Sequence, residues 1–176
     1  MHFLALFTHC PACGSTKFVQ NNEKSKRCES CGYVFYINAS AAVAAFIVNE
    51  NNELLVCIRA KEPEKGTFDL PGGFVDFNES AEQALIREIA EELNAIVIDS
   101  TYLFSLPNQY EYSRLTVPTL DMFYECKLDN TSNLKPSDDV EDCFFIPLKD
   151  IKPVLFGLNS VRKAVSMFLE NSINKE

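Results

Sequence analysis

The chain has 176 residues, of which 47% are hydrophobic and 23% are charged, and these globular proportions exclude a disordered chain. The formal net charge is −9 and the basic residues are scattered, so we do not expect nucleic acid as a partner. No apolar run approaches the roughly 18 residues of a membrane helix, and residues 1–7 lack the features of a signal peptide, which favours a cytoplasmic protein.

The first element along the chain is a polar, cysteine-rich segment at residues 9–32. A tight boundary near residue 37 separates it from an α/β pattern, so we expect two units, 1–37 and 38–176. Four of the seven cysteines form two C-x-x-C pairs that are separated by fourteen residues: Cys10, Cys13, Cys28 and Cys31. This spacing lets four thiolates reach one Zn²⁺ in a tetrahedron.

Each cysteine pair is followed by a glycine, which allows the backbone to turn beneath a metal. So short a segment with few large apolar residues needs a metal to fold. The alternatives are a redox dithiol or unrelated cysteines. We predict a zinc ribbon whose site is closed and structural.

The rest of the chain alternates strand and helix patterns. Strands are predicted at 40–49, 54–58, 68–70, 96–98, 101–106, 117–128 and 143–146, and helices at 78–93 and 159–171. The connections are a hairpin turn at 50–52, a charged loop at 59–67, a polar loop at 107–116 and an acidic loop at 129–142. Cys57, Cys126 and Cys143 lie in apolar runs and are expected to be buried core thiols. These elements predict an α/β fold.

The helix at 78–93 carries an unusual set of carboxylates. Ser80 and Gln83 fit a capping box that starts the helix near residue 81, and Asn94 can take the left-handed conformation that ends it. Three glutamates stand at i, i+3 and i+4, on one face: Glu88, Glu91 and Glu92. The helix by itself leaves two interpretations open, a solvated acidic face or a site for a divalent cation.

The residues before the helix favour the cation. Leu70-Pro71-Gly72-Gly73 ends a strand in a tight turn, where glycine lets the backbone approach a metal or a phosphate. Glu79 adds a further carboxylate before the helix, and Arg87 can orient these carboxylates by paired hydrogen bonds.

This segment resembles the Nudix box, G-x5-E-x7-R-E-U-x-E-E-x-G-U, in which U is a bulky aliphatic residue. The matching positions are Gly73, Glu79, Arg87, Glu88, Ile89, Glu91 and Glu92, whereas Asn94 and Ala95 replace the last two residues of the pattern. The resemblance implies an α/β/α sandwich with a mixed sheet, preceded here by the ribbon. It also implies hydrolysis of a diphosphate linkage in a nucleoside diphosphate derivative.

The ribbon resembles the one in zinc-containing NADH pyrophosphatases of this superfamily. Their motif S-Q-P-W-P-F-P-x-S is matched here at Ser105, Pro107 and Ser113, with Tyr110 in place of phenylalanine and no tryptophan. The resemblance suggests NADH, NAD or ADP-ribose as the class of small nucleotide substrate. Since many relatives are homodimers, a homodimer is the expectation for this chain.

The resemblance assigns roles to residues of this sequence. The Gly72 carbonyl with Glu88, Glu91 and Glu92 is expected to hold Mg²⁺ or Mn²⁺, and Glu88, helped by Glu79 and Arg87, to act in catalysis. One carboxylate from residues 138–142 is expected to contribute, with the choice left open.

Three further residues are candidates for substrate binding: Arg59, Tyr110 and Tyr112. The alternatives are a surface salt bridge for the arginine and ordinary loop packing for the tyrosines. A second hypothesis for the whole protein is a non-catalytic nucleotide sensor, with the ribbon as a protein-binding or nucleic-acid-binding module.

Overall fold

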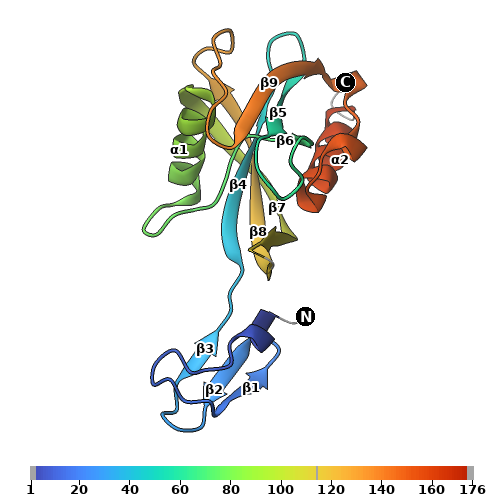
Figure 1. Ribbon diagram of the computed structural model, residues 1–176. Coiled ribbons are helices and arrows are strands. Elements are labelled where there is room, and N and C mark those ends of the chain that lie inside the picture. Colours follow the sequence, from blue (N-terminus) through green and yellow to red (C-terminus); the bar gives the residue numbers. More distant parts are fainter. Residues whose placement is uncertain (1–2, 114, 174–176) are drawn as a thin grey trace.

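The computed structural model describes residues 3–113 and 115–173 (Figure 1). In chain order these residues form η1 (Phe3–Leu6), β1 (Phe18–Asn22), β2 (Ser25–Cys28), β3 (Val34–Tyr36), β4 (Ser40–Ile47), β5 (Glu53–Arg59), β6 (Phe68–Asp69), α1 (Ala81–Leu93), β7 (Val97–Tyr112), β8 (Leu115–Leu128), β9 (Val140–Pro147), η2 (Leu148–Asp150), η3 (Pro153–Leu155) and α2 (Asn159–Ile173).

The N-terminal segment forms its own small antiparallel sheet, in the order β1-β2-β3. Its core contains Cys10, Phe18 and Cys28, and Figure 1 shows it below the sheets of the rest of the chain. Gly14 and Gly32 have φ angles of 72° and 78°, and their amides donate to the carbonyls of Cys10 and Cys28. These are the turns that the two C-x-x-C pairs predict.

The rest of the chain has two three-stranded sheets between two helices (Figure 1). One sheet has the order β4-β8-β7, with β4 parallel to β8 and β7 antiparallel to it, and the other has the order β6-β5-β9. Val43, Ala45 and Ile47 face the core beneath α1, and Ala44 and Phe46 face the core beneath α2. Since both faces of β4 are covered, its sequence is continuously apolar. The predicted α/β/α sandwich with a mixed sheet is confirmed.

The prediction of a hairpin around residues 50–52 is confirmed only at its turn. Asn52 has a φ of 61°, and one isolated antiparallel bridge joins Val48 to Leu54. Beyond that bridge the two strands separate, because β4 pairs with β8 and β5 pairs with β9. Local turn residues therefore indicated the reversal, but sheet pairing was decided by distant segments.

The prediction of a loop at 107–116 was wrong. Strand β7 runs on to Tyr112 and β8 begins at Leu115, so that Tyr110 lies opposite Val117. The proline at position 107 is compatible with a strand because β7 is at the edge of its sheet, where a missing amide can be tolerated. This extended hairpin carries Tyr110 and Tyr112 beside the glycine turn.

Two smaller predictions also need comment. Cys57 and Cys126 are buried as expected, but Cys143 is only partly buried because β9 is an edge strand. The last strand begins at Val140 rather than at residue 143, whereas the last helix begins at Asn159 as predicted. Within the described ranges, no helix is long and apolar enough to cross a membrane.

Candidate active site

Helix α1 presents its carboxylates to a cleft because its caps and its apolar stripe fix its rotation. The Ser80 Oγ accepts from the Gln83 amide at 3.2 Å, the Gln83 side chain accepts from the Ser80 amide at 2.8 Å, and Asn94 ends the helix with a φ of 51°. This is the predicted capping box and left-handed cap. The stripe that packs on the sheet is fully buried: Leu85, Ile89 and Leu93.

Arg87 is the centre of a hydrogen-bond network among these carboxylates. Its Nε and Nη2 donate to the two oxygens of Glu79, both at 2.9 Å, and its Nη1 donates to Glu88 at 2.8 Å and to Glu91 at 3.1 Å. A further bond at 2.9 Å reaches the Phe74 carbonyl. A paired guanidinium–carboxylate contact restricts rotation of both groups. Arg87 is therefore joined to Glu79 by a paired contact and to Glu88 by a single hydrogen bond, and its part in catalysis stays a prediction.

The glycine turn lies between β4 and α1 with no room for side chains. Gly72 has a φ of 142°, and a Cβ there would lie 2.1 Å from the Val43 carbonyl oxygen. A Cβ on Gly73 would lie 2.5 Å from the carboxyl carbon of Glu88. The Gly72 amide donates to Glu92 at 2.8 Å. The two glycines thus bring the backbone within reach of the helix carboxylates.

The carboxylates at this place differ in burial and in charge environment. Glu92 is 5% exposed; burial raises its pKa to about 9, and the charges of Glu88, Asp69 and Asp139 add to this effect. Burial also raises the pKa of Glu88, while hydrogen bonding from Arg87 lowers that of Glu79. Carboxylates that repel one another in a buried place form a donor set that suits a divalent cation.

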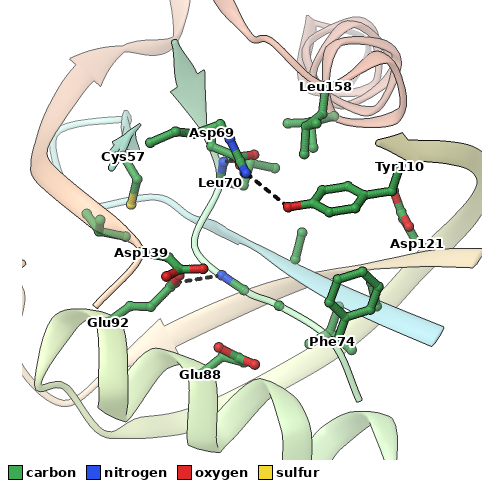
Figure 2. A pocket seen from close by; sticks show the side chains of 18 of the residues that line it. Cys57, Asp69, Leu70, Phe74, Glu88, Glu92, Tyr110, Asp121, Asp139 and Leu158 are labelled. Carbon is green, nitrogen blue, oxygen red and sulfur yellow. Dashed lines mark hydrogen bonds and ion pairs between the residues drawn. The ribbon is translucent and has the colours of Figure 1, made fainter. Parts of the chain in front are cut away.

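The helix borders a cleft with a volume of about 480 Å³ (Figure 2). Gly72, Gly73, Glu88, Glu91 and Glu92 line one part of it, and all three residues predicted to bind substrate line it as well: Arg59, Tyr110 and Tyr112. Glu79 does not line the cleft and reaches it through Arg87. Side chains from segments far apart in the sequence therefore surround a single space.

Arg59 does not form the surface salt bridge that was the alternative for it. Its guanidinium pairs with Asp69, and the two side chains are only 13% and 12% exposed. It also donates to the Pro63 carbonyl at 2.7 Å and to the Tyr110 hydroxyl at 3.2 Å. The Tyr110 ring in turn meets Phe74 edge-on, with centroids 5.4 Å apart. Sequence reasoning missed Asp69 and Phe74, because only the fold brings them to Arg59 and Tyr110.

The acidic loop contributes two of its carboxylates to the cleft. Asp138 and Asp139 line it, and both form ion pairs with Lys61. Glu141 and Asp142 are not among the lining residues. Asp138 and Asp139 are therefore the carboxylates of this loop that lie at the cleft, and the participation of either in the chemistry stays a prediction.

The four ribbon cysteines lie at distances that fit a metal. Their sulfur atoms are all within 4.8 Å of one another, with Cys10 and Cys31 3.7 Å apart and Cys13 and Cys28 3.6 Å apart. Sulfurs about 2.3 Å from a tetrahedral zinc ion would be about 3.8 Å apart. Within residues 3–113 and 115–173, no group of three or more acidic side chains converges so closely, and Glu88 and Glu91 each form an ion pair with Arg87.

Together these features define an α/β/α domain in which an acidic helix and a glycine turn border a cleft of small-molecule size. The model of the NUDIX domain family matches residues 39–166, and the chain belongs to this family.

Two curated relatives and one solved structure are similar to this chain. It is 30% identical over 135 residues to an ADP-ribose pyrophosphatase of Methanocaldococcus jannaschii, covering 74% of this chain and 75% of that protein. It is 23% identical over 160 residues to the NAD-capped RNA hydrolase NudC of Pseudomonas aeruginosa, covering 91% of this chain but 55% of the relative, so it spans about half of that protein. A NUDIX hydrolase from Nitrosomonas europaea superimposes with a TM-score of 0.71 and 22% identity, covering 93% of this chain and 90% of that one.

Proposed function

We propose that this protein is a Nudix hydrolase that cleaves the diphosphate linkage of a nucleoside diphosphate derivative, of the ADP-ribose or NADH class. One observation carries the proposal: the carboxylates of α1, the glycine turn, Tyr110 and Tyr112 line a single cleft of about 480 Å³. The relatives named for ADP-ribose and for NAD-capped RNA support the same substrate class. ADP-ribose and NAD both contain an adenosine diphosphate group.

The proposed cation is Mg²⁺ or Mn²⁺, which would be held by Glu88, Glu91, Glu92 and the carbonyl of Gly72. These are the hard oxygen donors that such ions take. The ion, when bound, would lower the pKa of a water molecule and neutralise charge on the departing phosphate.

The chain's own residues would position and deprotonate the attacking water. Glu88 would accept the proton, and its pKa, raised by burial, brings it nearer to the pH at which a general base works well. Arg87 would fix the Glu88 carboxylate, and Glu79 would fix Arg87 through two hydrogen bonds. The water oxygen bonds to one phosphorus while the bridging oxygen leaves with the other, which yields two phosphomonoesters.

The opposite part of the cleft would bind the organic part of the substrate. Tyr110, held by Arg59 at its hydroxyl and by Phe74 at its ring, would contact the nucleobase. Tyr112, on the same strand, would extend this contact surface. Asp138 or Asp139 would supply the further carboxylate from the acidic loop.

The ribbon would hold one structural Zn²⁺ through Cys10, Cys13, Cys28 and Cys31, with a domain boundary between residues 37 and 38. Four protein ligands would leave no open position for a water molecule, so that this zinc would take no part in the chemistry. The homodimer, the cytoplasmic location and the absence of a nucleic-acid partner remain predictions.

The test is an assay of purified protein with ADP-ribose, NADH and a dinucleoside polyphosphate, each with and without Mg²⁺. We expect cleavage only with the metal, and two phosphomonoesters as the products from ADP-ribose or NADH. The Glu91→Gln, Glu92→Gln double variant should lose turnover and keep its helix content, whereas Glu82→Gln, on the same helix but away from the cleft, should keep both. Binding of a nucleotide without any turnover would instead identify a sensor.

A further inference from the structure

Asp121 is a buried acidic residue of the cleft that the proposed chemistry does not use. It lies on β8 opposite Leu106, is 7% exposed and lines the cleft. In Figure 2 it is drawn on the Tyr110 side of the cleft, away from Glu88 and Glu92. A buried acidic side chain of this kind requires a physical explanation, because taking a carboxyl group out of water is costly.

No cation of the cleft is paired with Asp121 in the described part of the chain. The basic side chains that line the cleft are Arg59, Lys61 and Arg87. Arg59 pairs with Asp69, Lys61 pairs with the acidic loop, and Arg87 pairs with Glu79 and the carboxylates of α1. The Asp121 carboxyl group therefore has no partner among the ion pairs of the cleft.

Two hydroxyl groups hold the Asp121 carboxylate in place. The Thr119 hydroxyl donates to Oδ1 at 2.6 Å, and the Ser160 hydroxyl, in the first turn of α2, donates to Oδ2 at 2.5 Å. A carboxylate has about four acceptor positions, two on each oxygen. The two hydroxyls use one position on each oxygen, so each carboxylate oxygen can accept one more hydrogen bond.

Hydrogen bonds that connect β8 to α2 do not by themselves require a carboxylate. Hydroxyl groups both donate and accept, so an asparagine at position 121 could bond to Thr119 and Ser160 equally well. What asparagine lacks is the negative charge and the second acceptor oxygen. These two properties suit a ligand that brings N–H or O–H donors, and they repel a phosphate.

We propose that Asp121 is a specificity residue that accepts a hydrogen bond from the nucleoside of the substrate, through the 2′-hydroxyl of its ribose or the amine of its base. The inference rests on the proposed function. It also fixes the orientation of the substrate in the cleft: the diphosphate would lie toward the α1 carboxylates and their cation, and the nucleoside toward Asp121.

The test compares ADP-ribose with two analogues, one lacking the 2′-hydroxyl of the adenosine ribose and one with hypoxanthine in place of adenine. For the wild-type protein we expect kcat/KM to fall about 10- to 100-fold with one analogue, which also identifies the donor. Asp121→Asn should lose the same factor with ADP-ribose and show no further loss with that analogue. Ser160→Ala, which cuts the tie to α2 but keeps the carboxylate, should lower the melting temperature and keep the discrimination.

Two results would overturn the inference: a wild-type protein that accepts both analogues as well as ADP-ribose, or an Asp121→Asn variant that still discriminates. If Asp121→Asn does not fold, the wild-type comparison alone decides. Binding measured by calorimetry with Ca²⁺ reads the same contact without turnover. A protein that binds ADP-ribose through Asp121 but hydrolyses nothing would refute the proposed function and leave this inference standing, whereas one that does not bind ADP-ribose refutes the inference.

Discussion

Replacing Gly73 with alanine should damage catalysis while leaving the fold almost unchanged. The new Cβ would lie 2.5 Å from the carboxyl carbon of Glu88, whereas ordinary contacts begin at 3.4 Å, so the carboxylate must move by about 1 Å. It is the far end of a side chain, so it can move without a shift of the backbone, at the expense of its hydrogen bond from Arg87. A displacement of this size at a reacting group lowers rates about 100-fold, or by about 2.7 kcal/mol in the barrier.

The neighbouring Gly72 provides the contrast, because there the obstacle is backbone. A Cβ on Gly72 would lie 2.1 Å from the Val43 carbonyl oxygen, and the φ of 142° is a conformation that alanine resists. We expect Gly72→Ala to destabilise the protein by at least about 2 kcal/mol. Gly73→Ala should change stability by less than about 1 kcal/mol.

The assay for both variants is the release of phosphomonoesters from ADP-ribose with Mg²⁺, together with urea unfolding. The steric reasoning fails if Gly73→Ala turns over at the wild-type rate. It also fails if both variants unfold at the same denaturant concentration, since the reasoning requires Gly72→Ala to be the less stable of the two.

Three more predictions concern the cleft, the ribbon and the helix end. Because the pKa of Glu92 is raised to about 9 from an ordinary 4.5, the folded chain keeps a proton that the unfolded chain has lost, so metal-free stability should fall between pH 5 and 9 by roughly a few kcal/mol. Glu92→Gln should flatten this decline in urea unfolding at fixed pH. Cys28→Ser should reduce zinc from about one ion per chain to none by elemental analysis and melt the ribbon, as seen by loss of its dispersed amide NMR signals, while resonances from α1 remain. Asn94→Ala, at a φ of 51°, should cost about 1 kcal/mol in thermal unfolding, and an unchanged melting temperature would contradict the left-handed cap.

The elements predicted best are those whose signals are local. The capping box of Ser80 and Gln83, the cap at Asn94 and the start of α2 at Asn159 all follow from residues within one or two helical turns. The convergence of the four cysteines was also predictable, since a spacing of two residues lets both thiols of a pair reach one ion. In each case the physical cause acts over a few residues.

Predictions failed where the outcome depended on pairing between distant strands. Residues 107–112 are polar and include a proline, yet they form strand because β8 provides partners along them. In the same way, β4 and β5 separate after a single bridge because each finds a distant partner. Strand pairing depends on what a neighbouring strand offers, and no short stretch of sequence contains that information.

The sequence alone determined the acidic helix, its rotation and its glycine turn, because helical geometry fixes which side chains share a face. It could not distinguish the environments of the three glutamates, which the fold makes different. Glu92 is buried, Glu88 is paired with Arg87, and Glu91 is half exposed. Only the tertiary structure brought Asp69 and Asp121 into the same cleft. Burial and long-range contacts set the charge state and the role of a carboxylate, and both arise only when the chain has folded.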